Sequence, residues 1–338
     1  LAAAARAAPA AQPPADAPDA IVFAAGDFNA DLVAIDPDGG GRRTLTATAG
    51  VAERSPDWSP DGRQVAFVAP RADGPVAAER AIWVLASDAE GAPISLPLSF
   101  GPDDSGPDWS PDGGRIAFAS TLALGREDEA SSSLTVLAPG SGDLQLVLEP
   151  LVSRVAVLRQ PRWSPDGRRL AFVVDVDAGR ATAAGAPNAG GELYVVDADG
   201  RGARRLFAHP GWDDRDPAWS PDGRLLAFAS APIRPPGAGV AAAALWLLDP
   251  ATGQAGALVG GGSDDVRGPK WSPDGRRLVA AWAAGGPSAP PSLVVIDPAA
   301  PRLAQPLAAG AEPDWARRPL LPTPTPAVTG GAPTPTDG

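Results

Sequence analysis

The chain has 338 residues, a net charge of −12 at pH 7 and an isoelectric point near 4.6, with no cysteine and no methionine. This acidic balance argues against nucleic acid and anionic membrane surfaces as partners, because both select basic patches. The missing cysteines exclude disulfides, thiolate metal sites and a cysteine nucleophile. No apolar run approaches the ~20 residues of a membrane span.

The predicted elements begin with three short strands, at residues 21–24, 32–35 and 43–46. A repeat follows, in which Trp-Ser-Pro-Asp-Gly occurs at 58–62, 109–113, 163–167, 219–223 and 271–275. A degenerate sixth copy is Pro313-Asp314-Trp315, and successive motif tryptophans are 44 to 56 residues apart. Self-similarity at such a period is typical of repeat architectures.

Each repeat predicts four strands. An extended Pro-x-Trp segment leads into Ser-Pro-Asp-Gly, where proline presets φ and glycine takes a positive φ, as in a tight hairpin. The next run is apolar on both faces, which indicates a strand buried on both sides. These second strands are expected at 65–68, 116–119, 170–173, 226–229 and 278–281. Third strands are expected at 82–85, 134–137, 193–196, 245–248 and 293–296, and weaker fourth strands follow. Four antiparallel strands per ~40–50 residues predict a β-propeller blade.

The number of blades follows from the two ends of the repeat. There are six Pro-x-Trp strands, but the strand around Trp315 has no second, third and fourth strand after it. The three N-terminal strands supply that missing set. We therefore predict an all-β, six-bladed β-propeller of four-stranded antiparallel blades, closed by pairing of the C-terminal strand with the N-terminal three. Closure removes open sheet edges, which promote aggregation.

The signature Pro-x-Trp-Ser-Pro-Asp-Gly-x-x-Leu-Ala-Phe resembles the TolB-type (WD40-like) propeller family, over about residues 21–318. That family includes periplasmic scaffolds, stand-alone exported propellers and propeller domains of peptidases. We expect an Ala/Pro-rich disordered linker at 1–20 and a Pro/Thr-rich disordered tail at 319–338, because neither composition can bury a core. The resemblance implies an exported protein, periplasmic or on the cell surface. We also expect a monomer that meets a membrane only through an anchor outside this sequence.

Catalytic chemistry has few candidates. His209 is the single histidine, so a His-cluster metal site is impossible and a Ser-His-Asp triad could use only this residue. No Gly-x-Ser-x-Gly elbow is present. Paired aspartates precede three Pro-x-Trp strands, at 103/104, 213/214 and 264/265. They could hold Ca²⁺ or act as acid and base, but we favour solvated loops, and we expect no metal, no cofactor and no catalytic residue.

Binding is expected on one face of the ring. The Ser-Pro-Asp-Gly turns are short, whereas the connections at 70–80, 121–132, 175–191, 231–243 and 283–291 are long, and they belong to the opposite face. Variable loops on a rigid scaffold commonly carry binding sites. Two residues before the proline of four Pro-x-Trp strands stand Arg54, Arg159, Arg215 and Arg267. Their guanidinium groups would suit a carboxylate or phosphate at the channel mouth. Alternatively, each pairs with a nearby acid such as Glu53, Asp216 or Asp265.

A second candidate is the segment around His209 and Trp212. We predict that Trp212 lies in a loop, where it could stack on a sugar or anchor a peptide, or instead fold over the adjacent blade. The motif tryptophans are expected to pack between blades: Trp58, Trp109, Trp163, Trp219, Trp271 and Trp315. The residues before them carry mixed charges, which indicates internal pairing or a wet channel.

These features favour non-catalytic binding of a protein, peptide or glycan through the long-loop face, as a scaffold of the cell envelope. One alternative is the propeller domain of a larger exported, prolyl-oligopeptidase-like enzyme without its hydrolase domain. Another is a saccharide-active propeller enzyme.

Overall fold

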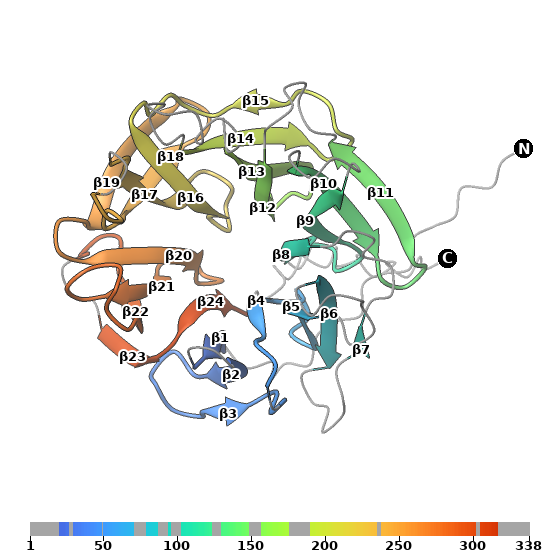
Figure 1. The fold of residues 1–338 in the computed structure, drawn as a ribbon, viewed down its shortest axis with the longest axis horizontal. Helices are drawn as coiled ribbons and strands as arrows, with labels where there is room; N and C mark the ends of the chain where they lie inside the picture. Colours follow the sequence, from blue (N-terminus) through green and yellow to red (C-terminus); the bar gives the residue numbers. More distant parts are fainter. Residues whose placement is uncertain are drawn as a thin grey trace, which may run out of the picture.

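A computed structural model shows six four-stranded antiparallel blades arranged in a ring (Figure 1), with the second and third blades joined by one parallel residue pair, Arg80–Asp103. It describes residues 20–26, 30–48, 50–70, 79–86, 94–95, 103–123, 130–148, 157–175, 190–234, 238–301 and 305–316. Within these ranges all regular elements are strands, and no helix is long and apolar enough to cross a membrane. The predicted all-β, six-bladed propeller is confirmed. The expected terminal segments, 1–20 and 319–338, lie outside the described residues apart from Ala20, and so does much of the long connections.

The strands follow the repeat, with the motif tryptophan at the end of each innermost strand. The first three blades contain β24 (Ala311–Trp315), β1 (Ile21–Ala25), β2 (Asp31–Ile35) and β3 (Arg43–Thr44); β4 (Arg54–Trp58), β5 (Gln64–Pro70), β6 (Arg80–Ala86) and β7 (Ile94–Ser95); and β8 (Asp103–Trp109), β9 (Ile116–Ala123), β10 (Ala130–Ala138) and β11 (Asp143–Leu148). The last three contain β12 (Val157–Trp163), β13 (Arg169–Asp175), β14 (Gly191–Asp197) and β15 (Arg204–Arg205); β16 (Trp212–Trp219), β17 (Leu226–Pro232), β18 (Ala244–Asp249) and β19 (Gln254–Gly260); and β20 (Asp265–Trp271), β21 (Leu278–Ala283), β22 (Ser292–Ile296) and β23 (Gln305–Ala309).

The ring closes where the two ends of the chain meet in one blade. Strand β24 pairs antiparallel with β1, with Trp315 opposite Ile21 and Asp314 opposite Val22. The amide of Ala316 then donates to the carbonyl of Ala20 at 2.8 Å. The predicted closure by the C-terminal strand is therefore confirmed, and Figure 1 shows β24 beside β1.

The Ser-Pro-Asp-Gly turn is held by its serine hydroxyl. In the turn after β16, Ser220 Oγ donates to Asp222 Oδ1 at 2.6 Å and accepts from the amide of Leu225 at 2.9 Å. Gly223 has a φ of +70° and donates its amide to the Ser220 carbonyl at 2.8 Å. The same serine–aspartate bond occurs in the other four copies, so one sequence gives one turn throughout.

Neighbouring turns also touch around the ring. A Cβ built on Gly113 would lie 3.7 Å from Pro60 Cδ, and one on Gly167 would lie 3.8 Å from Pro111 Cδ. The pairs Gly223–Pro165 and Gly275–Pro221 repeat this contact. The proline of one turn therefore packs on the glycine of the next, which gathers the short turns on one face.

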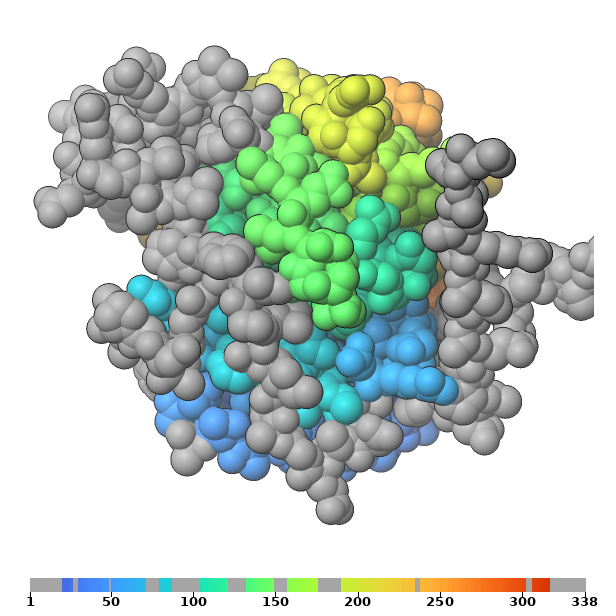
Figure 2. All heavy atoms as spheres, turned by 90° about the vertical axis from the view of Figure 1, so that its right-hand side faces the viewer, coloured from blue at the N-terminus to red at the C-terminus, as the bar shows by residue number. Residues whose placement is uncertain are grey.

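The core lies between the blades. All six motif tryptophans are 9 % exposed or less, and Trp58 shares a cluster with Leu32 of β2 and Phe67 of β5. The ring is seen from its edge in Figure 2, where β11 (green) is the outer strand of its blade. On this strand Leu144 and Leu146 are 41 % and 47 % exposed. Apolar packing thus decreases from the inner strands to the outer ones.

Candidate functional site

The innermost strands carry the side chains at both ends of the channel. Each begins at the long-loop face and ends with the motif tryptophan at the short-turn face. Before its proline, each makes an irregular step at a residue with positive φ. These residues are Ser55 (50°), Gly106 (61°), Gln160 (52°), Asp216 (54°), Gly268 (59°) and Glu312 (52°). Such conformations cost non-glycine residues about 1–3 kcal/mol each, so contacts nearby must offset them.

Those contacts run from blade to blade. The amide of Asp216 donates to Gln160 Oε1 at 2.9 Å, and the amide of Gly268 donates to Asp216 Oδ2 at 3.1 Å. The amide of Ser55 donates to Glu312 Oε2 at 2.5 Å. These side chains therefore fix the backbone of the following blade. These contacts were not predicted from the sequence, although the residues that make them stand directly before the proline of each Pro-x-Trp segment.

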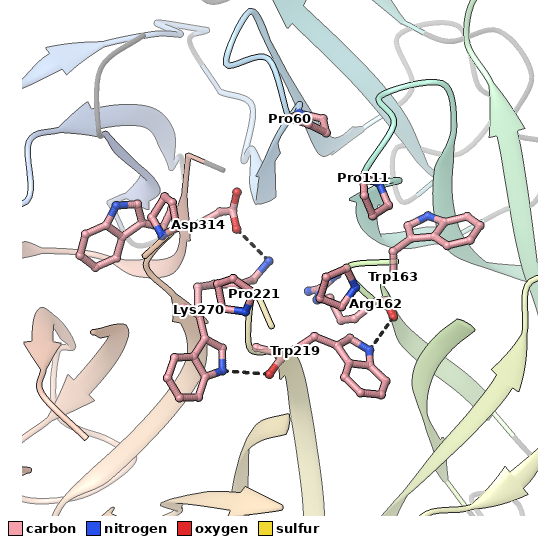
Figure 3. Close-up of a pocket in the computed structure, with 13 residues that line it drawn as sticks. Pro60, Pro111, Arg162, Trp163, Trp219, Pro221, Lys270 and Asp314 are labelled. Carbon is pink, nitrogen blue, oxygen red and sulfur yellow. Dashed lines mark hydrogen bonds and ion pairs between the residues drawn. The ribbon is translucent and has the colours of Figure 1, made fainter. Parts of the chain in front are cut away.

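Lys270 forms an ion-pair centre in the channel (Figure 3). Its Nζ lies 3.2 Å from Asp57 Oδ1 and 3.0 Å from Asp314 Oδ1, and its side chain is only 11 % exposed. Figure 3 shows the pair with Asp314. The same two carboxylates accept the backbone amides of Trp109 and Trp58, at 2.7 and 2.8 Å. One ammonium therefore ties the sixth blade to the first and second. The mixed charges before the motif tryptophans are thus at least partly paired internally.

The short-turn end of the channel holds a cavity of about 300 Å³ with a lining of proline and tryptophan rings. The indole N–H groups of Trp219 and Trp271 donate to the carbonyls of Arg162 and Ala218, both at 3.2 Å (Figure 3). Arg162 and Lys270 line this cavity and also the one at the opposite end. They therefore lie between the two cavities, in the middle of the channel.

The cavities at the long-loop end of the channel are larger than the one at the short-turn end. Two cavities of about 590 and 730 Å³ share Arg215, Asp216 and Arg267 in their lining, and Arg159 lines the first. Three of the four arginines singled out from the sequence therefore meet at this end. Arg54 is exposed and lines neither of these two cavities.

The three cavity arginines are all paired with aspartates. Arg215 Nε lies 2.6 Å from Asp213 Oδ2 and Arg267 Nε lies 2.8 Å from Asp265 Oδ2, while Arg159 pairs with Asp175. Their side chains nevertheless remain 39–41 % exposed. Burial and the nearby positive charge of Arg215 lower the pKa of Arg159, which indicates that these two guanidinium groups lie close together.

Of the three acids named as alternative partners of these arginines, one pairs with an arginine and two have other contacts. Asp265 does pair with Arg267. Asp216 instead bonds with Gln160 and Gly268, and Glu53 accepts the hydroxyl of Thr46.

His209 is packed among aromatic rings. It stacks on Trp212 with ring centroids 4.7 Å apart and planes 6° from parallel, and it meets Trp246 edge-on at 4.8 Å. The prediction that Trp212 lies in a loop is wrong. It is the first residue of β16 and pairs with Pro232, because the strand ladder continues beyond the Pro-x-Trp segment.

The same histidine belongs to a Ser-His-Asp cluster. Its Nδ1 lies 2.9 Å from Asp214 Oδ1, and Ser230 Oγ donates to that same oxygen at 2.6 Å. Burial raises the pKa of Asp214 despite these two bonds. A nucleophilic serine needs the imidazole to accept its proton, but Ser230 Oγ is 3.4 Å from Nδ1, bonds the carboxylate and is only 1 % exposed. The arrangement satisfies a buried carboxylate.

The preference for solvated paired aspartates is also wrong for the second member of each pair. Asp104, Asp214 and Asp265 are 0 %, 2 % and 6 % exposed. The reason is that β8, β16 and β20 start earlier than expected, so these residues belong to strands and not to loops. Across the described ranges, no group of three or more acidic or histidine side chains is arranged to hold a metal ion.

Comparison with known proteins agrees with this architecture. TolB from Acinetobacter baumannii superimposes with a TM-score of 0.65 and 20 % identity, covering 90 % of this chain and 68 % of that one. A putative TolB from Agrobacterium tumefaciens gives 0.62 and 17 %, covering 87 % and 90 %. The chain thus has the fold of a TolB-like six-bladed β-propeller.

Sequence comparison gives a more limited result. No protein-family model matches the chain. An uncharacterized peptidase, YuxL of Bacillus subtilis (strain 168), is 30 % identical over 120 residues. That match covers 36 % of this chain and 16 % of the peptidase, so it concerns a small part of the longer protein.

Proposed function

We propose that this propeller is a non-catalytic binding or scaffold protein of the cell envelope, which engages a protein, peptide or glycan through its long-loop face. The observation that carries the proposal is the pair of adjoining cavities at that end of the channel, which share Arg215 and Arg267. Open concave surfaces of this size are where rigid scaffolds usually bind ligands. The opposite end is smaller and is lined by the turn prolines and packing tryptophans.

Export and a monomeric state belong to the same proposal. The TolB-like fold favours a location in the periplasm or on the cell surface, and the absence of cysteine and the acidic charge are compatible with it. Residues 1–20 and 319–338 would then serve as tethers.

The peptidase alternative has a specific observation in its favour, the similarity to YuxL over 120 residues. In that case the propeller would be one part of a longer enzyme, and hydrolysis would need a second domain. The Ser230–His209–Asp214 cluster does not supply such chemistry, because its hydroxyl is buried and bonded to the carboxylate.

Loss-of-binding variants on each face test the proposal. Val240 lines the 730 Å³ cavity and is 68 % exposed, so Val240→Asp should abolish capture of a specific envelope partner without unfolding the ring. Leu144→Asp on the outer strand is the matched control, and Arg276→Glu probes the short-turn face. Both should retain the partner, measured by quantitative mass spectrometry of envelope extract and then by titration of the purified partner.

Two results would contradict the proposal. The first is loss of the partner with Arg276→Glu but not with Val240→Asp, which would move the site to the short-turn face. The second is recovery of the partner in cleaved form, which would favour an enzyme.

A further inference from the structure

Two consecutive blades contain the same side-chain device at the long-loop end. In β16, Asp213 Oδ2 accepts from Arg215 Nε at 2.6 Å, and its Oδ1 accepts from the amide of Gly191 at 2.8 Å. In β20, Asp265 Oδ2 accepts from Arg267 Nε at 2.8 Å, and its Oδ1 accepts from the amide of Ala243 at 2.7 Å. We call each unit an Asp-x-Arg clamp. Each ties the preceding blade to the arginine of its own strand.

In the first clamp the two blades approach closely at Gly191, whereas the second clamp uses the amide of an alanine, Ala243. A Cβ on Gly191 would lie 2.5 Å from the carbonyl oxygen of Asp214, so only glycine lets its amide reach Asp213. The amide of Gly191 thus fixes the carboxylate of Asp213, and this carboxylate in turn fixes Arg215. The Nε of Arg215 is therefore held in place by contacts from its own strand and, through Asp213, from the preceding blade.

The clamp also decides which arginine atoms remain available. The aspartate takes Nε, the guanidinium nitrogen nearest the backbone. A guanidinium presents five N–H donors in a rigid fork, and its terminal nitrogens bind an oxyanion in two parallel bonds. The side chains of Arg215 and Arg267 are 40 % and 41 % exposed and line both cavities. The clamps therefore orient two forks toward one space.

Cationic side chains outnumber acidic ones on the lining of that space, although Arg159, Arg215 and Lys270 pair with carboxylates that lie just outside it. The 590 Å³ cavity is lined by six cationic side chains and three acidic ones, in a chain with a net charge of −12. All three acids, Asp216, Asp265 and Glu312, accept backbone amides of neighbouring blades. A single exposed ion pair contributes little in water, so useful affinity requires several at once.

We propose that the long-loop cavities bind a ligand bearing two or more oxyanion groups, carboxylate or phosphate, held by Arg215 and Arg267 together with Arg159. Asp213 and Asp265 are positioning residues of this site. The inference rests on the proposed function, because it names the ligand chemistry of the same face.

Titration calorimetry of the full chain at low salt tests it, with citrate and pyrophosphate as multivalent probes and acetate as the monovalent one at matched ionic strength. We expect citrate or pyrophosphate to bind roughly tenfold or more tightly than acetate, and the stronger of the two to identify the oxyanion. The double variant Arg215→Gln/Arg267→Gln should lose this binding.

Asp213→Asn separates positioning from simple charge. The change makes the cavity more positive, so electrostatics alone predicts tighter binding of an anion. An amide offers one acceptor oxygen in place of two, so it cannot hold both Arg215 and Gly191. If Asp213 positions Arg215 for the ligand, Asp213→Asn should bind the multivalent anion roughly tenfold more weakly. This is the size expected for losing a hydrogen bond to a charged group. Asp199→Asn, at a position 61 % exposed and absent from both cavities, makes the same charge change and should leave binding as in the wild type.

Three results overturn the inference: no preference of the wild type for either multivalent probe, unaltered binding by the double arginine variant, or equal or tighter binding by Asp213→Asn. Thermal unfolding of each variant confirms that it is folded. If these titrations fail while partner capture still depends on Val240, the inference is wrong and the proposed function stands. If partner capture is indifferent to Val240→Asp, the proposed function itself fails.

Discussion

Replacing Lys270 by methionine should destabilise the whole ring, because one ammonium serves two buried carboxylates. Methionine keeps the length of the side chain and removes the charge. Asp57 and Asp314 are 0 % and 2 % exposed at the side chain, and the Nζ lies 3.2 and 3.0 Å from their oxygens. Removing one partner from a buried ion pair typically costs about 3–5 kcal/mol, since the charge left behind stays out of water.

That cost is large on the scale of a folded domain. A domain of this size loses roughly 2 °C of melting temperature per kcal/mol, so we expect Lys270→Met to melt about 6–10 °C below the wild type. Denaturant unfolding followed by tryptophan fluorescence gives the free energy directly. Arg276→Met is the matched control, because Arg276 is exposed in the adjacent turn and should change stability by no more than about 0.5 kcal/mol.

The effects of substituting Lys270 and its two aspartates should not be additive. In the triple variant Lys270→Met/Asp57→Asn/Asp314→Asn no carboxylate loses its cation, so part of the stability should return. A Lys270→Met protein as stable as the Arg276→Met control would refute the claim that this ammonium ties three blades together.

Four further outcomes follow from the geometry. Ser220→Ala should make melting temperature less sensitive to acid below about pH 4, as melting curves against pH will show. The Ser220 hydroxyl lowers the pKa of Asp222, so the stability from this bond is present above the unfolded value near 3.9 and is lost as the pH falls through the lower folded pKa. Gly223→Ala should cost about 1–2 kcal/mol in denaturant unfolding, because its φ is +70°. Trp163→Ala should cost about 3–5 kcal/mol by the same measurement, since this indole is 2 % exposed. Deleting residues 311–338 removes β24 and exposes the edge of β1, so light scattering should show self-association.

The sequence predicted the ring because the repeat specifies it locally. Five copies of one turn, held by the same serine–aspartate bond, place each inner strand, and the strand around Trp315 has a single place to pair. Such features can be predicted from one repeat alone, without knowing the contacts between neighbouring blades. Strand starts were less predictable, since Trp212 and Asp265 join their strands through ladder bonds beyond the motif.

The site was only partly predictable for a related reason. Three of the four arginines reach the cavities, as repeat symmetry suggests. Two of them, Arg215 and Arg267, have an aspartate two residues before them, whereas Arg159 has valine and Arg54 has alanine there. That Asp-x-Arg spacing was visible in the sequence, yet it was interpreted as solvated acid. What it does depends on the amides of Gly191 and Ala243 in the preceding blades, a contact that no single repeat encodes.

The most direct test of the account is to ask which face touches the partner. A photo-crosslinking amino acid placed at Val240, beside the long-loop cavities, should form a covalent adduct with the envelope partner in cell extract. The same group at Arg276, in a short turn on the opposite face, should form none. An adduct from position 276 and none from position 240 would contradict the central claim that the long-loop face is the binding face.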